Sequence, residues 1–217
     1  MDGPGVDALM RDYDGDVPGA SLHIGSGPVA LSGWTNVDLV PYEGVHVVCD
    51  VRHGLPFKSV DLIFAEHFIE HLTLAGGLRF LRECRRTLAA DGTLRLSTPN
   101  LDWVWLTHYK PPAEMSLEEE LYGCLEMNRA FHGWGHQFLY NRRTLTSALR
   151  SAGFGLVIEL AYGESENAAL QNLERHERHR DLPDAPSVLV LEASGYGNDD
   201  TEFERIAEPY IRDAAVT

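Results

Sequence analysis

Short apolar runs, separated by tight loops or by helical patterns, constrain the fold of this 217-residue chain more than any other feature. Each run is five or six residues long, too short for a buried helix and typical of a buried strand. Five of them lie in the first half of the chain and two in the second. They span residues 20–24, 35–39, 45–49, 60–65, 93–97, 155–160 and 187–192.

Helical patterns alternate with these runs. Residues 74–88 repeat apolar side chains at helical spacing, and residues 144–152 lie between Asn141 and Gly153, which favour a helix start and a helix stop. The alternation predicts an α/β fold with a mostly parallel seven-stranded sheet and helices on both faces. The last two runs flank a polar insert, residues 161–185, and therefore predict an antiparallel hairpin at one edge.

The same patterns divide the chain. We expect one domain over residues 20–193, a loose lead-in over 1–19 and an acidic tail over 194–217 with one helix at 201–211. Residues 100–140 are expected to form a lid or substrate insert above the sheet, including an acidic helix at 114–125. The motif LERHERHR in the insert 161–185 predicts a second, exposed helix.

Composition excludes several classes of function. The net charge of −15 disfavours nucleic acid and anionic membrane surfaces as partners. No apolar run approaches a membrane span, and the acidic N-terminus lacks the apolar core of a secretory signal. The three cysteines are widely spaced, so neither a thiolate zinc site nor a disulfide framework is expected. These features predict a cytoplasmic protein with reduced thiols.

Glycines and acids stand where the first four strands end. Gly25 and Gly27 follow the first strand and would let a ligand approach the backbone closely. Asp38, Asp50 and Glu66 end the next three strands, at the sheet edge where open α/β folds bind ligands. One acid can accept hydrogen bonds from ribose hydroxyls and another from an adenine amino group. The pattern predicts a nucleoside site, although each acid alone could cap a helix.

The spacing of the motif distinguishes between cofactors. Asp38 follows Gly25 after only 13 residues, whereas a dinucleotide fold typically needs about 20. Pro28 also interrupts the glycine pattern of a dinucleotide loop. A small nucleoside cofactor is therefore favoured. An NAD(P)-binding oxidoreductase and a non-catalytic module that binds a nucleoside cofactor stay open as alternatives.

Three segments together resemble class I S-adenosylmethionine-dependent methyltransferases: LHIGSGPVALSGWTNVDL, VCDVRHGLPFKSVDLIFAEHFIEHL and LRFLRECRRTLAADGTLRLSTPN. The GWTNVDL pattern is similar to a small subgroup in which the first helix is shortened. The resemblance covers residues 20–100 and continues more weakly to 193. It implies a Rossmann-like fold and S-adenosylmethionine as cofactor. It also implies these cofactor-binding residues: Gly25, Ser26, Gly27, Asp38, Leu39, Asp50, Val51 and Glu66.

Two histidine clusters suggest further chemistry. His67, Glu70 and His71 share one face of a helical turn, a mixed set that suits a divalent metal. These residues, with His136, resemble the metal cluster of small-RNA 2′-O-methyltransferases, and ubiquinone-pathway O-methyltransferases carry a similar EH motif. The resemblance implies a site made by His67, Glu70, His71 and His136. Three imidazoles favour zinc, manganese or iron over magnesium. Without a metal, His71 or His136 would be the catalytic general base.

The acceptor side is predicted from aromatic residues. Trp103, Trp105 and Trp134 lie in the insert and could form the wall of a pocket for a small molecule or a sugar. The alternative is that Trp103 and Trp105 only pack the insert on the body. The favoured function is methylation of a small molecule or glycan, at oxygen rather than nitrogen, with nucleic acid disfavoured by charge. The sequence does not indicate an oligomeric state.

Overall fold

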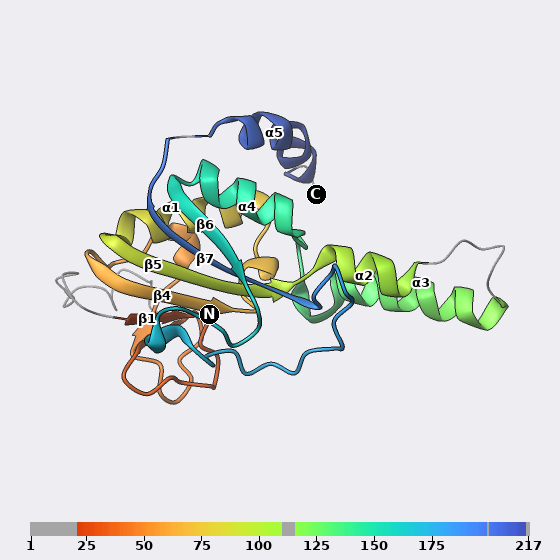
Figure 1. The fold of residues 1–217 in the computed structure, drawn as a ribbon, viewed down its shortest axis with the longest axis horizontal. Helices are drawn as coiled ribbons and strands as arrows, with labels where there is room; N and C mark the ends of the chain where they lie inside the picture. Colours follow the sequence, from red (N-terminus) through yellow and green to blue (C-terminus); the bar gives the residue numbers. More distant parts are fainter. Residues whose placement is uncertain (1–20, 110–115, 199, 216–217) are drawn as a thin grey trace, which may run out of the picture.

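A seven-stranded sheet organises the molecule in the computed structural model, which describes residues 21–109, 116–198 and 200–215 (Figure 1). The strand order is β3-β2-β1-β4-β5-β7-β6. Strands β1 to β5 are parallel, and β7 runs antiparallel to both β5 and β6. The strands are β1 (Ser21–Ile24), β2 (Thr35–Asp38), β3 (Val47–Val48), β4 (Val60–Glu66), β5 (Leu88–Pro99), β6 (Phe154–Leu160) and β7 (Val188–Tyr196). The predicted sheet with an antiparallel edge hairpin is confirmed.

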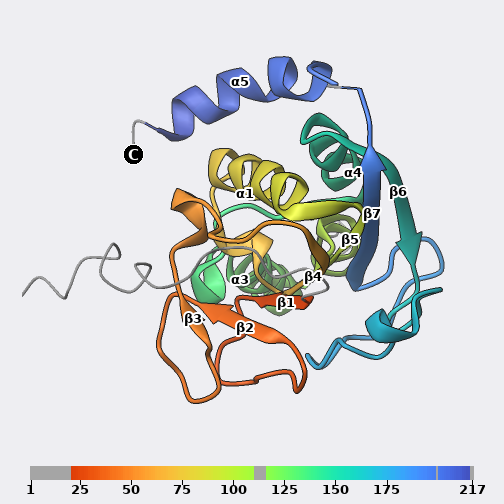
Figure 2. The ribbon, with the colours of Figure 1, turned by 90° about the vertical axis from the view of Figure 1, so that its left-hand side faces the viewer.

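Three helices lie together on one side of the sheet: α1 (Leu74–Thr87), α4 (Arg142–Ser151) and α5 (Glu202–Ala214) (Figure 2). On the opposite side, within the described residues, loops and the short turn η6 (Ala168–Leu170) replace the long helices that we expected there. The connection between β1 and β2 is simply too short to hold a helix. No helix of the described part of the chain combines the length and apolar character needed to cross a bilayer.

Asn36 explains how β2 tolerates the short loop before it. Its side chain is fully buried against the loop. Backbone N–H and carbonyl groups of the loop that are buried there need hydrogen-bond partners, because unpaired buried groups are costly. The amide oxygen accepts from the Leu31 N–H at 2.9 Å, and the amide nitrogen donates to the carbonyls of Leu31 at 3.1 Å and Trp34 at 3.3 Å. One side chain therefore satisfies backbone groups of the loop that would be paired with each other if the connection were a helix.

The carboxyl edge of the sheet carries α2 (Leu101–His108) and α3 (Leu117–His132). Helix α2 was not predicted. Helix α3 replaces the helix expected at 114–125 and continues to His132, where Gly133 follows as its C-cap. The lead-in over residues 1–19 and the insert residues 110–115 lie outside the described residues. The tail carries α5 as predicted, although the last turn of the helix extends beyond residue 211.

The helix predicted from LERHERHR is wrong, because residues 172–181 form no helix. Long-range contacts determine their conformation instead. Arg95, fully buried in β5, donates to Glu174 at 2.6 Å and to Glu192 of β7 at 2.7 Å. Arg95 also donates to the carbonyl of Glu164 at 2.8 Å. The insert is therefore held against the sheet by a buried ion network rather than by helical hydrogen bonds.

Candidate functional site

The loop after β1 has the backbone that its glycines permit. Gly25 and Gly27 have φ angles of 67° and 53°, a region that favours glycine. A Cβ at Gly25 would overlap the Phe68 ring, whereas one at Gly27 would meet no protein atom within 4 Å. The N–H of Gly27 donates to Asp38 Oδ2 at 2.8 Å. The loop is thus shaped by Asp38 and presents bare backbone to open space.

A cavity of about 480 Å³, which we call the glycine-loop cavity, lies at this edge of the sheet. Six of the eight predicted cofactor-binding residues line it: Gly25, Gly27, Asp38, Leu39, Asp50 and Val51. Ser26 is buried within the loop, and its hydroxyl has no hydrogen-bond partner among the described residues. Glu66 does not line the cavity.

The two aspartates of the cavity differ in how their carboxylates are used. Asp38 accepts from the N–H groups of Gly27 and Val40, each at 2.8 Å, so each oxygen retains capacity for another donor. Asp50 is held by Arg52, whose guanidinium donates to the two carboxylate oxygens at 2.8 and 2.6 Å. The hydrogen bonds from Arg52 lower the pKa of Asp50. Asp38 is therefore the aspartate better placed to accept from added hydroxyl groups.

Glu66 lies at the end of β4, but its side chain faces the insert over residues 161–185. Its Oε1 accepts from the N–H groups of Arg175 at 2.7 Å and His176 at 3.0 Å. Its Oε2 lies 3.2 Å from Nδ1 of His176. In this structure the carboxylate fixes the position of residues 172–181.

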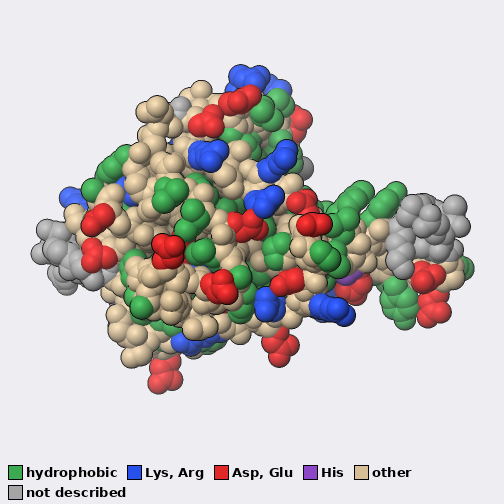
Figure 3. All heavy atoms as spheres, viewed as in Figure 1, with side chains coloured by type: hydrophobic (Ala, Val, Ile, Leu, Met, Phe, Trp, Pro, Cys, Tyr) green, Lys and Arg blue, Asp and Glu red, His purple; other side chains and the backbone are tan. Residues whose placement is uncertain are grey.

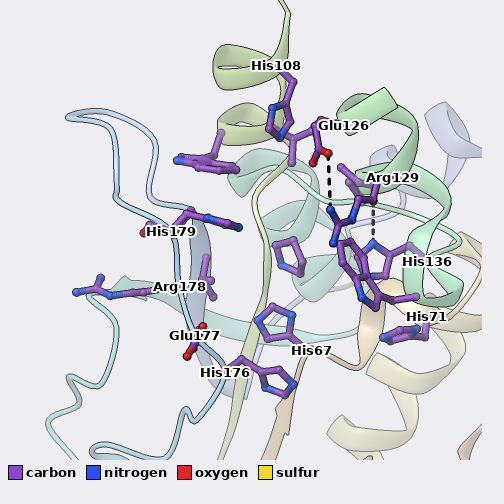
Figure 4. A pocket seen from close by; sticks show the side chains of 18 residues that line it. His67, His71, His108, Glu126, Arg129, His136, His176, Glu177, Arg178 and His179 are labelled. Carbon is purple, nitrogen blue, oxygen red and sulfur yellow. Dashed lines mark hydrogen bonds and ion pairs between the residues drawn. The ribbon is translucent and has the colours of Figure 1, made fainter. Parts of the chain in front are cut away.

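A second cavity, of about 350 Å³, lies between α2, α3 and the insert, and we call it the histidine cavity (Figure 4). Trp103 and Trp134 contribute aromatic walls. Six of the ten histidines of the chain line it: His67, His71, His108, His136, His176 and His179. His67 and His71 line the glycine-loop cavity as well. The two cavities therefore meet at these two side chains.

His67 adopts an unusual backbone conformation at this boundary. Its φ angle is 45°, which costs a non-glycine residue roughly 1–3 kcal/mol and is typical of functional sites. Its ring packs on His176 with centroids 4.4 Å apart. Nδ1 lies 3.2 Å from Oε1 of Glu70 without the geometry of a hydrogen bond.

Glu70, His71 and His136 form a cluster in which one ligand atom from each lies within 4.8 Å of the others. Glu70 is fully buried, and its Oε2 accepts from the Thr98 hydroxyl at 2.9 Å. Its Oε1 has no hydrogen-bond partner among the described residues. A buried carboxylate oxygen without a partner is costly, so this donor set fits a bound cation. His67, the fourth predicted ligand, is not part of the cluster.

His136 is held in a defined orientation. Its Nδ1 lies 2.8 Å from the carbonyl oxygen of Ala130, which can only accept, so Nδ1 carries a proton. In the neutral ring Nε2 then has a free lone pair, as a metal ligand or a general base needs. The carbonyl of Glu70 accepts from the N–H groups of Gln137 at 2.7 Å and Phe138 at 3.2 Å. These bonds bring two segments together that lie far apart in sequence.

The functional residues that sequence reasoning missed come from the insert over residues 161–185. His176 and His179 belong to the LERHERHR motif, from which the sequence predicts an exposed helix, yet both line the histidine cavity. His179 stacks on Trp103 with centroids 4.9 Å apart, and Trp103 Nε1 donates to the Arg180 carbonyl at 3.0 Å. The signal that could have found them is Arg95, since an arginine inside a core strand requires a buried acidic partner.

Comparisons with known proteins agree with this geometry. Residues 28–96 match the family model of a methyltransferase domain. A S-adenosylmethionine-dependent methyltransferase from Archaeoglobus fulgidus is 18% identical, with a TM-score of 0.51, over 87% of this chain and 92% of that one. The CMeT domain of the citrinin polyketide synthase is 15% identical, with a TM-score of 0.50, over 83% of this chain and 47% of that one.

PigF, solved with S-adenosylhomocysteine, is 17% identical, with a TM-score of 0.48, and is matched over 87% of this chain and 54% of its own length. The chain thus spans about half the length of PigF and of the citrinin synthase structure. No curated protein matches the sequence. Identities this low show the fold alone. Residues 28–96 thus match a methyltransferase domain, and the chain has the fold of the S-adenosylmethionine-dependent methyltransferase from Archaeoglobus fulgidus.

Proposed function

We propose that the chain methylates an oxygen atom of a small molecule or a glycan, with assistance from a divalent metal. The observation that carries this proposal is the pair of cavities that share His67 and His71. A donor held in the glycine-loop cavity and an acceptor held in the histidine cavity would meet at that boundary. Alignment of the reacting groups supplies much of the acceleration of such a transfer.

The glycine-loop cavity would hold S-adenosylmethionine, which supplies an electrophilic methyl group when bound. The bare backbone at Gly27 would allow close approach of the cofactor. Asp38 would accept from the ribose hydroxyls, since both of its oxygens retain capacity, and Leu39 and Val51 would contact the nucleoside through apolar atoms. Asp50 is engaged with Arg52, so we assign it the weaker role of an anionic neighbour of the adenine.

Glu70, His71 and His136 would hold the metal. Two imidazoles and one carboxylate suit zinc, manganese or iron better than magnesium. When bound, a divalent ion lowers the pKa of an acceptor hydroxyl. Thr98 fixes the Glu70 carboxylate, and Ala130 fixes the ring of His136. If no metal binds, Nε2 of His136 is the group best prepared to take the acceptor proton.

The acceptor would be small. A cavity of about 350 Å³ lies at the lower end of the range for small-molecule sites. Trp103 and Trp134 could pack on a planar ring or on the apolar face of a sugar.

Titration with S-adenosylhomocysteine, followed by calorimetry, tests the cofactor site. We expect micromolar binding by the wild type and binding at least about tenfold weaker by Asp38→Ala, because it loses charge-assisted hydrogen bonds. Asp61→Ala, which changes an exposed aspartate of β4, is the matched control and should bind like the wild type. No binding by the folded wild type, together with binding of NADH, would reinstate the oxidoreductase alternative.

Metal analysis after dialysis against zinc, manganese or iron tests the second site without an activity assay. We expect one ion per chain in the wild type and loss of that ion in Glu70→Gln and in His136→Phe. His108→Gln changes a histidine of the same cavity outside the cluster and should keep the ion. A metal-free wild type would refute metal assistance and leave His136 as the candidate base.

A further inference from the structure

The carboxylate of Asp50 has no room for a donor from a ligand. Its side chain is only 9% exposed. Oδ1 accepts from the backbone N–H of Arg52 at 3.0 Å and from Nε of the same residue at 2.8 Å. Oδ2 accepts from Nη2 of Arg52 at 2.6 Å and lies 3.3 Å from Nδ1 of His53. A carboxylate offers about four acceptor positions, so this one is full and cannot also accept from an adenine amino group.

The same contacts hold Arg52 in one orientation. Its Nε and Nη2 donate side by side to the two oxygens of Asp50, and this bidentate geometry fixes the plane of the guanidinium. The Arg52 side chain is nevertheless 53% exposed, and the residue lines the glycine-loop cavity together with Val51. A flat, charged and accessible group is therefore fixed at the wall of this cavity.

Pairing with a carboxylate is not by itself unusual for an arginine of this protein. Figure 3 shows Lys and Arg side chains interspersed with Asp and Glu side chains on one face of the molecule. Arg142, for example, pairs with Glu159 at 2.9 Å and is 63% exposed, but it lines neither the glycine-loop cavity nor the histidine cavity. Arg52 differs because its partner carboxylate is little exposed and because the residue lines a cavity.

We propose that Arg52 binds the adenine of the cofactor by stacking its guanidinium on the face of the ring, and that Asp50 orients Arg52 instead of contacting the amino group. This inference rests on the proposed function, which assigns S-adenosylmethionine to the glycine-loop cavity. Arginine stacks on aromatic faces because its guanidinium is flat and weakly hydrated. Every base offers such a face, whatever groups its edge carries.

Stacking and hydrogen bonding make different demands on the ligand. An acid that accepts from the amino group would distinguish adenine from a purine that lacks this group. A guanidinium on the face of the ring tolerates the same change, since the flat surface remains. The two modes of recognition can therefore be separated by binding measurements alone.

Calorimetric titration with S-adenosylhomocysteine tests the role of Arg52. We expect Arg52→Ala and Arg52→Lys each to bind about tenfold more weakly than the wild type, because both lose the stacked plane. Lysine keeps the charge and can still pair with Asp50, so Arg52→Lys isolates the contribution of the flat group. Arg142→Ala is the matched control and should bind like the wild type.

The turn η2 (Val51–His53) should survive these substitutions, because its N-cap hydrogen bond joins the Asp50 side chain to the backbone N–H of residue 52. Circular dichroism of each variant checks that the fold is kept.

A second ligand tests the role of Asp50. The analogue of S-adenosylhomocysteine that carries purine without the amino group should bind the wild type within about threefold of S-adenosylhomocysteine. Wild-type affinity in Arg52→Lys, or a loss of about tenfold or more when the amino group is absent, would overturn this inference and leave the cofactor assignment intact. A folded wild type that does not bind S-adenosylhomocysteine would overturn both.

Discussion

Replacement of Arg95 by methionine should destabilise the protein by about 3–5 kcal/mol, the usual result of removing one partner of a buried ion pair. The Arg95 side chain is completely buried, with 0% of it exposed, as is that of Glu174. Its guanidinium lies 2.6 Å from Glu174 and 2.7 Å from Glu192. Methionine fills a similar volume, so the loss comes from two buried carboxylates left without their cation rather than from a void.

Two further variants separate this explanation from others. Arg142→Met removes an ion pair of similar length, 2.9 Å to Glu159, but Arg142 is 63% exposed. Because the Arg142 guanidinium keeps its hydration, loss of this pair should lower the free energy of unfolding far less than Arg95→Met does. The triple variant Arg95→Met, Glu174→Gln, Glu192→Gln removes the buried charges together and should regain much of the loss.

Urea unfolding, followed by tryptophan fluorescence and circular dichroism, measures the free energy of unfolding of each variant. Unchanged dependence on urea would show that the denatured states are comparable. Equal losses in Arg95→Met and Arg142→Met would refute the reasoning. So would a triple variant that is no more stable than Arg95→Met.

Three other outcomes follow from the structure. Gly25→Ala should weaken S-adenosylhomocysteine binding measured by calorimetry, because the added methyl group would overlap the Phe68 ring. Gly33→Ala is the control: its φ is also positive, but the added methyl group would meet open space, so this variant should lose only about 1 kcal/mol of stability. Burial lowers the pKa of His23 below 6.5, so the unfolded chain binds the extra proton and stability should fall as pH drops below about 6.5. His23→Leu should flatten that slope in unfolding measured between about pH 5 and 7. Glu66→Ala should raise the rate of hydrogen exchange of residues 172–181 about tenfold, because two backbone hydrogen bonds are lost. The same variant should leave S-adenosylhomocysteine affinity unchanged, and a weaker affinity would instead place Glu66 at the cofactor.

Much of the fold was predictable because its signals are local. Apolar runs of strand length marked all seven strands, and the shortened β1–β2 loop was visible from the spacing of Gly25 and Asp38. The glycine loop and Asp38 could also be placed, since both stand at strand ends and strand ends share one edge of the sheet. Helix α2 escaped prediction because its apolar side chains are spread around the helix, with Val104 buried and Trp105 and Leu106 exposed, so its sequence lacks an amphipathic pattern.

The sequence by itself determined the order of strands and helices, the glycine loop and the identity of the residues that could bind a metal. Only the tertiary structure decided how those residues meet. Backbone hydrogen bonds from Gln137 and Phe138 to Glu70 bring His136 to the Glu70–His71 turn but leave His67 facing His176. Arg95 and Glu66 draw the histidines of residues 172–181 onto the site, which no local pattern encodes. The physical reason is that helix and strand patterns reflect contacts between residues close in sequence. The partner of a buried charge, in contrast, can lie anywhere in the sequence and is determined by the folded arrangement of the chain.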